Sequence, residues 1–373
     1  MVASDHLDRT AEGSPPGMDD CGNREVTPPV SHRPVRASVV IPARNSEGTI
    51  ARVITACLEQ DLGAERFEVV VVDDGSSDDT WRILKEYASR GEILALRQPN
   101  LGAAAARNAG TRASSGEILV FCDADIIVPP NWLRRLVDAA SGPEVGLVGC
   151  VYAPAEALPL ITSCTHEEIR RRQIRGPDAP LHIGSFTMAL RRSLFESVGG
   201  FDVEFIRAQD TELSYRVAET GYRSCLLKDL EVRHEHTRTL REWLVNQHKQ
   251  AFWRARTVNR HPSCACGDGY ACWRDWASLA ASAAMLLTAP LALVGQLWIV
   301  PATMLGLLAA LQIPQTAFAI RDTGEWRHLA MIPLQMLRSV AWLAGSIASL
   351  IAPRRHEAQV PEREAATESR SII

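Results

Sequence analysis

The feature that most restricts the fold of this 373-residue chain is an uncharged stretch near its carboxyl end. From Trp276 to Ile320, about 45 positions carry no charged side chain, whereas one bilayer crossing needs roughly 20 apolar residues. The alternative is the buried helical core of a water-soluble protein, but a run of this length is typical of chains in lipid. We therefore expect two membrane helices joined by a tight turn, with Pro290 and Pro301 complicating where each helix begins.

A third apolar stretch, from His328 to Ala352, is interrupted by Arg338. An arginine at that place has to reach the interface, pair with an acid or face other protein. We predict a membrane region of two to three helices over 276–352, followed by a polar tail over 353–373. The number of crossings stays open. The flanking positive charges favour a multi-pass protein of the cell (plasma) membrane with a cytoplasmic amino-terminal domain; they are Arg254, Arg256, Arg260, Arg321, Arg327, Arg354 and Arg355.

Composition excludes several classes of protein. The net charge of -4 gives no attraction to phosphate backbones, so we expect no nucleic-acid partner. Positions 1–35 are rich in acids, proline and glycine without the apolar core of a signal peptide, which predicts a disordered leader. The nine cysteines are scattered, as reduced cysteines are. Whether the cluster of Cys264, Cys266 and Cys272 binds a metal, with His261 as a fourth ligand, is left open.

Between these regions, apolar β-branched runs alternate with helical patterns from Ala37 to Val151. Such strands predict a parallel sheet with helices on both faces, in which ligands bind beyond the carboxyl ends of the strands. Polar side chains follow three of the strands and are expected to converge on one crevice. The looser segment after them would receive a second substrate, so we expect a domain over 36–260 with halves 36–151 and 152–260. The converging residues are Arg44 and Asn45, Asp73 and Asp74, and Asp123 and Asp125.

The segment FCDAD places Asp123 and Asp125 at the end of an apolar strand. Two carboxylates at this spacing can hold a hard divalent cation against a diphosphate, although an acidic turn or helix cap gives the same pattern. Upstream, Asp73 or Asp74 could accept hydrogen bonds from a nucleobase or ribose, with Gly75 serving the turn. Arg107 could face a diphosphate or simply solvent.

Six motifs in this order resemble glycosyltransferase family 2, and the resemblance covers about Ala37 to His236. It implies an α/β, Rossmann-like GT-A domain followed by C-terminal transmembrane helices. It also implies a nucleotide-diphospho-sugar donor, Mg²⁺ or Mn²⁺, and inversion at the anomeric carbon. The motifs are VVIPARN (39–45), VVVDDGSSDDT (70–80), LGAAAARNAG (101–110), ILVFCDAD (118–125), GSFTMALRRSLFESVGGFD (184–202) and AQDTELSYRVAETGYR (208–223).

The same resemblance implies a role for individual residues. In the family the general base is the Asp of an acidic pair, which is Asp210 here, whereas the usual acidic neighbour is Gln209. Either His234 or His236 could complete a metal shell, and His234 fits better. The remaining assignments are Pro42, Ala43 and Arg44 for the nucleobase pocket, Asp73 or Asp74 for the base, Asp123 for the ribose or metal, and Asp125 as the principal metal ligand.

We therefore predict a hexosyltransferase-type enzyme that moves a sugar, with a UDP-sugar expected, to a lipid-linked or saccharide acceptor in cell-envelope synthesis. Two alternatives stay open, a processive polysaccharide synthase and a silent nucleotide-sugar-binding protein. A nucleotidyltransferase would need a glycine-rich phosphate loop that IPARNSEG lacks. Processive relatives carry Gln-x-x-Arg-Trp, whereas Trp253 and Arg254 stand here in reversed order. The basic run from Ile169 to Arg175 could face lipid headgroups or solvent.

Overall fold

A computed structural model describes residues 35–63, 66–154, 158–234, 239–262 and 273–352. The predicted leader lies outside these ranges except for its last residue, and the predicted tail lies outside them entirely. The cysteine cluster, Cys264, Cys266 and Cys272, and the alternative ligand His236 also fall outside the described residues.

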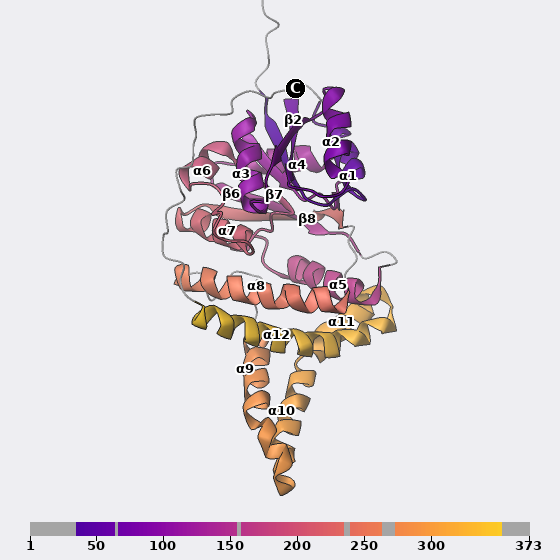
Figure 1. Cartoon of the computed structure of the whole chain (residues 1–373), viewed down its shortest axis with the longest axis vertical. Coiled ribbons are helices and arrows are strands. Elements are labelled where there is room, and N and C mark those ends of the chain that lie inside the picture. Colours follow the sequence, from indigo (N-terminus) through magenta and orange to yellow (C-terminus); the bar gives the residue numbers. More distant parts are fainter. Residues whose placement is uncertain (1–34, 64–65, 155–157, 235–238, 263–272, 353–373) are drawn as a thin grey trace, which may run out of the picture. The chain divides into compact units, whose positions relative to one another are not determined.

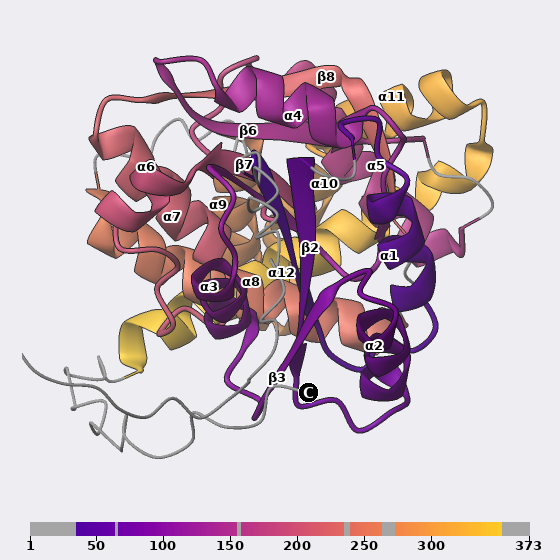
Figure 2. The same cartoon turned by 90° about the horizontal axis from the view of Figure 1, so that it is seen from above.

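The amino-terminal part of the described chain alternates strands and helices, as predicted (Figures 1 and 2). The strands are β1 (Ala37–Ala43), β2 (Phe67–Asp74), β3 (Leu94–Gln98), β4 (Ile118–Cys122), β5 (Ile126–Ile127), β6 (Val145–Tyr152), β7 (Thr187–Arg191) and β8 (Arg223–His234). The helices among them are α1 (Ile50–Leu58), α2 (Thr80–Ser89), α3 (Ala103–Ala113), α4 (Trp132–Ala140), α5 (Leu160–Arg175), α6 (Arg192–Ser197) and α7 (Gln209–Glu219).

The carboxyl-terminal part of the described chain is helical. Three helices in it are long and apolar enough to cross a membrane, by length and composition, which confirms that the predicted membrane region has the required segments. Its elements are α8 (Leu240–Arg260), α9 (Trp273–Thr288), the short 3₁₀ helices η3 (Ala289–Leu293) and η4 (Gly295–Trp298), α10 (Ile299–Ala310), α11 (Ile313–Thr323), η5 (Trp326–Ala330) and α12 (Met331–Ile351).

The sheet is mixed, with strand order β3-β2-β1-β4-β7-β6-β8-β5. The first four strands pair in parallel, as predicted. The expectation of a parallel sheet up to Val151 is wrong beyond β4, because β7 inserts between β4 and β6 and pairs antiparallel with both. This strand begins at Thr187, whereas β6 ends at Tyr152, and no local pattern indicates its insertion.

Helices cover both faces of the sheet, so side chains on both faces are buried. Successive side chains of β1 point to opposite faces. Val39 and Ile41 pack with α1 and α4, whereas Val40 packs on the side of α3, α6 and α7. Figure 2 shows α1 and α2 on one side of β2 and α3 on the other. Gly110 lets α3 approach closely, since a Cβ there would lie 2.5 Å from Val40 Cγ1. This packing fixes the strand ends from which the site is built.

Candidate active site

A crevice of about 1080 Å³ lies at the carboxyl ends of β1, β2 and β4. Arg44 and Asn45 follow β1, Asp74 ends β2, and Asp123 follows β4, and all four line the crevice. The predicted convergence of three strand ends is therefore present. It follows from parallel pairing, because the carboxyl ends of parallel strands share one edge of the sheet.

The two acids at the end of β2 have different surroundings. Asp73 is fully buried and does not line the crevice; its Oδ2 lies 2.9 Å from Arg97 Nε. Asp74 lines the crevice, and its oxygens accept hydrogen bonds from the backbone N–H groups of Leu101 and Gly102, at 2.8 and 2.9 Å. Asp74 therefore holds the loop that leads into α3. Of the two acids, Asp74 is the one that a molecule bound in the crevice can contact.

Gly75 serves the turn after these acids, as predicted. Its φ of +72° lies in the left-handed region, and a Cβ at this position would lie 2.8 Å from the backbone nitrogen of Asn100. The turn thereby brings the β2 end against the loop before α3.

Two of the residues assigned to the nucleobase pocket, Pro42 and Arg44, line the crevice. Ala43 between them is buried in the core and does not line it, because alternate residues of a strand point to opposite faces. Ala43 pairs with Asp73 at the end of β1, and its neighbours Pro42 and Arg44 face the crevice.

Arg107 from α3 is buried against Asp123, with its Nη2 2.5 Å from Asp123 Oδ1. Loss of surrounding water raises the pKa of the Asp123 carboxyl; Arg107 acts against this shift, and the like charge of Asp125 adds to it. Arg107 is thus not a solvent-facing cation. Its charge is directed to the first carboxylate of the Asp-x-Asp motif.

Asp125 and His234 meet across the site, with His234 Nε2 3.0 Å from Asp125 Oδ2. The contact follows from strand pairing, because β5 and β8 are antiparallel and place Ile126 opposite His234. Asp125 immediately precedes this pair. Two carboxylates and an imidazole are a suitable ligand chemistry for Mg²⁺ or Mn²⁺.

No three acidic, histidine or cysteine side chains among the described residues form a complete metal cluster on their own. Asp123 is turned to Arg107, and Asp125 to His234. A cation held here would take oxygen ligands from the diphosphate of a donor as well, as Mg²⁺ commonly does with phosphate substrates.

Asp210 lies in the first turn of α7 and lines the same crevice. Its Oδ2 accepts from the backbone N–H of Ser185 at 3.3 Å, and its Oδ1 from that of Thr211 at 2.8 Å. The preceding Ala208 has a φ of +57°, so the chain turns sharply before the helix and directs Asp210 to the crevice.

Gln209, at the position where the family resemblance implies an acid, contacts Arg107. In the amide orientation that satisfies both neighbours, its oxygen lies 2.6 Å from Arg107 Nη1 and its nitrogen 3.1 Å from the Phe205 carbonyl oxygen. Arg107 therefore links the helix that carries Asp210 to Asp123. The sequence pattern did not predict this link.

Sequence reasoning also missed an aromatic group that lines the crevice. The Tyr152 ring stacks on Phe186 with centroids 4.3 Å apart and on His234 at 5.2 Å. His166 from α5 lies 5.2 Å from the same ring, and burial lowers the pKa of His166. Phe186 belongs to the quoted motif GSFTMAL and could have been found there. His166 and Tyr152 carry no comparable signal.

The carboxyl-terminal helices contribute one wall of the crevice. Gln250 and Arg254 come from α8, and Trp342 comes from α12. The crevice is therefore formed by the strand ends together with the helices α8 and α12.

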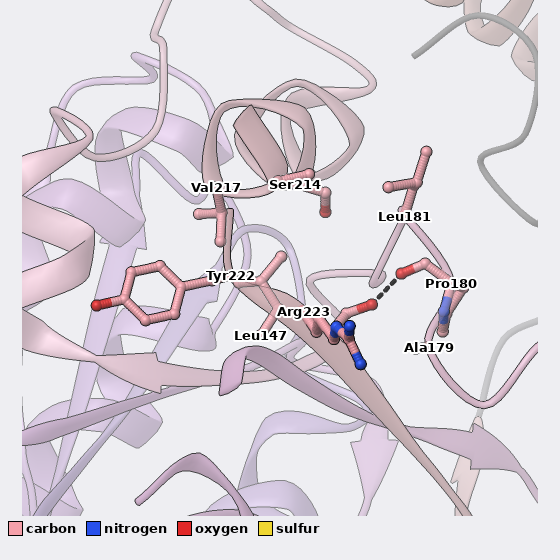
Figure 3. Close-up of a pocket in the computed structure, with 10 residues that line it drawn as sticks. Leu147, Ala179, Pro180, Leu181, Ser214, Val217, Tyr222 and Arg223 are labelled. Atoms are coloured by element: carbon pink, nitrogen blue, oxygen red, sulfur yellow. Dashed lines mark hydrogen bonds between the residues drawn. The ribbon is translucent and has the colours of Figure 1, made fainter. Parts of the chain in front are cut away.

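A second, smaller cavity of about 320 Å³ lies between α7 and the start of β8 (Figure 3). Apolar side chains such as Leu147, Leu181 and Val217 line much of it, and none of the predicted site residues does. It is a separate feature from the crevice that holds the carboxylates.

The fold is that of a known class of enzymes. The structure aligns with a mannosyltransferase from Pyrobaculum calidifontis, solved with GDP-Man and Mn²⁺, at a TM-score of 0.62 and 22% sequence identity. The alignment covers 86% of this chain and 88% of that one. The chain therefore has the predicted GT-A fold, a mixed-sheet, Rossmann-like domain, followed by long apolar helices.

Residues 38–199 match the model of glycosyl transferase family 2, so the chain carries a family 2 glycosyltransferase domain. Validoxylamine A glucosyltransferase of Streptomyces hygroscopicus subsp. limoneus is 30% identical over 269 residues, covering 62% of this chain and 58% of that protein. The pre-mycofactocin glycosyltransferase of Mycobacterium tuberculosis is 29% identical over 245 residues, covering 62% and 49%. The match thus spans less than two thirds of either relative.

Proposed function

We propose that this protein is an inverting, metal-dependent glycosyltransferase that moves a sugar from a nucleotide-diphospho-sugar to an acceptor hydroxyl at the cytoplasmic face of the cell membrane. The observation that carries the proposal is that the Asp-x-Asp carboxylates, His234 and Asp210 line one crevice at the strand ends of a family 2 domain. The donor that we expect is a UDP-sugar.

Asp210 is the general base of this proposal. Inversion needs a carboxylate beside the acceptor hydroxyl, on the side opposite the leaving diphosphate. The backbone N–H groups of Ser185 and Thr211 hold the two Asp210 oxygens in place. As the acceptor oxygen attacks the anomeric carbon, Asp210 takes its proton, and the bond to the diphosphate breaks.

The donor half of the crevice holds the leaving group. Asp123, Asp125 and His234 would hold Mg²⁺ or Mn²⁺, which when bound neutralises charge on the departing nucleoside diphosphate. Pro42, Arg44 and Asp74 line the side at which the nucleobase and ribose are proposed to bind. Arg107 keeps Asp123 oriented through its 2.5 Å contact.

The acceptor enters in this proposal from the side of Gln250 and Arg254 of α8 and Trp342 of α12, and α12 is part of the apolar region. This supports an acceptor that resides at the membrane, either lipid-linked or part of a saccharide, in cell-envelope polysaccharide or glycolipid synthesis. The reversed order of Trp253 and Arg254 favours single transfer. A ladder of products on a synthetic acceptor would favour processive synthesis instead.

The test is transfer from a panel of UDP-, GDP- and dTDP-sugars by the full chain in detergent with Mn²⁺. We expect turnover of one donor by the natural sequence, and its loss in Asp125→Ala and Asp210→Ala. Metal-dependent binding of a donor without turnover, in the presence of a broad acceptor panel, would favour the silent-binder alternative.

A further inference from the structure

The helix α12 is apolar enough to cross a membrane, yet it packs along α8. Figure 1 shows α8 and α12 running side by side, while α9 and α10 run across their direction. Trp342 Nε1 of α12 donates to Gln247 Oε1 of α8 at 2.9 Å. Gly345 makes this approach possible, because a Cβ there would collide with the His248 carbonyl oxygen.

A buried group of charges ties α12 to the catalytic domain. Glu168 of α5 accepts hydrogen bonds from both Arg338 and Gln335 of α12. Arg172 Nη2 of α5 lies 2.8 Å from Glu168 Oε1 and 2.8 Å from Asp275 Oδ1. Asp275 is in the first turn of α9. Arg338, expected to snorkel, pair or face protein, thus pairs with an acid on the domain.

This group fixes the depth of α12. Two acids and two arginines at the centre of a bilayer would be strongly unfavourable, whereas between a helix and the domain the same hydrogen bonds form outside the hydrocarbon. A helix whose first half is bonded to α5 and whose side packs on α8 lies at the level of the domain.

The α9–α10 segment has the opposite character. Its two ends meet, because Gln312 Nε2 donates to Ser278 Oγ at 3.0 Å across 34 positions. Half of that length at 1.5 Å per residue gives a hairpin about 25 Å deep, close to the roughly 30 Å of a bilayer core. Near the tip, the side chains of Leu287 and Leu293 are 81% and 92% exposed. No charged residue stands between the two ends.

After the hairpin the chain returns to the domain. Arg175 of α5 stacks on Phe318 of α11, with its guanidinium carbon 3.7 Å from the ring centroid. Arg171 Nη2 of α5 lies 3.2 Å from Asp322 Oδ2 of α11. The candidate span Gly295–Thr323 is therefore divided: α10 belongs to the hairpin, and α11 lies against α5.

We propose that this chain inserts into the bilayer through the hairpin 278–312 alone and lays α12 along the membrane surface. Both ends of the apolar region then lie on the same side of the membrane as the catalytic domain. The outer face of α12 contacts lipid through exposed side chains such as Leu337, Ile347 and Leu350. The inference depends on the membrane attachment proposed above, and it is independent of donor, acceptor and catalysis.

The test is protease protection in sealed, inside-out membrane vesicles that contain the full chain with different epitope tags before Met1 and after Ile373. We expect the protease to remove both tags without detergent. Loss of one tag and protection of the other would mean an odd number of crossings and would overturn the proposal. Transfer activity measured on the same vesicles separates this outcome from a failure of the proposed function.

A cysteine pair checks the hairpin itself. Leu293→Cys places a thiol near the tip, and Val203→Cys is the matched control on the catalytic domain, where the side chain is also exposed. A membrane-impermeant maleimide added to the same vesicles should label Val203→Cys at once, and Leu293→Cys at least tenfold more slowly until detergent is added. Equal labelling of both, above the background of the parent chain, would place the hairpin in water and overturn the proposal.

Discussion

His234 Nε2 lies 3.0 Å from Asp125 Oδ2, although 109 positions separate them in the chain. The antiparallel pairing of β5 with β8 creates this contact, since it aligns Ile126 with His234. A carboxylate and an imidazole are thereby held ready on one side of the crevice.

The first prediction concerns this pair. Asp125→Asn should lower transfer by about 100-fold or more, because the amide is a poor ligand for a hard cation. His234→Gln should cost about 10-fold, as loss of a supporting ligand commonly does. Mn²⁺ titrations of transfer rate measure both effects. Full activity of Asp125→Asn at the parent's Mn²⁺ requirement would contradict the assignment.

Asp210→Asn tests the general base. The amide keeps the size of the side chain but cannot take a proton, so kcat should fall by about 10²- to 10⁴-fold. Donor binding, measured by calorimetry with the nucleoside diphosphate and Mn²⁺, should stay within about threefold of the parent because Asp210 is assigned to the acceptor side. A variant that lost donor binding to the same extent would show that Asp210 acts on the donor.

Gln209 provides a prediction about Arg107. In Gln209→Leu the Arg107 Nη1 group loses a partner in a buried place, which should cost about 1–3 kcal/mol of stability. Gln209→Glu is the matched control, because its carboxylate can accept from the same group. We expect it to retain the thermal stability of the parent in detergent. Equal melting temperatures for all three chains would exclude the contact.

The buried charges beneath α12 predict a stability effect. Arg338→Met removes one of the two arginines that contact Glu168 and should destabilise the protein by about 1.5–3 kcal/mol, the usual cost of losing a hydrogen bond to a charged group. Arg338→Met leaves Arg172 facing both Glu168 and Asp275, and the double variant Glu168→Gln with Arg338→Met removes the excess negative charge and should recover part of the loss. Denaturant unfolding in detergent measures both. A single variant as stable as the parent would mean that the pair does not hold α12.

The core cysteines should resist alkylation. Burial raises the pKa of Cys150 to about 12 and that of Cys164 to about 11, so at pH 7 very little of either is thiolate. Labelling at these positions should therefore require denaturant, as peptide mass spectrometry can check. Rapid labelling of Cys150 in the folded chain would show that β6 opens to solvent.

Much of the domain could be predicted from local patterns. The strands β1, β2 and β4 are short apolar runs followed by polar residues, and parallel pairing brings Arg44, Asp74 and Asp123 to one edge. The position of β7 could not be predicted in this way. Its place between β4 and β6 depends on which exposed strand edge it pairs with, and that is a property of the assembled sheet.

The sequence by itself determined the alternating strands, the motif residues and the presence of long apolar segments, because hydrophobic period and run length are local properties. Only the tertiary structure decided that Asp73 is buried, that Arg107 joins Asp123 to Gln209, and that α12 lies on α8. These outcomes depend on contacts between residues far apart in the chain. A long apolar helix meets the same local requirement whether lipid or protein covers it, and the contact of Arg338 with Glu168 is not visible in the local pattern.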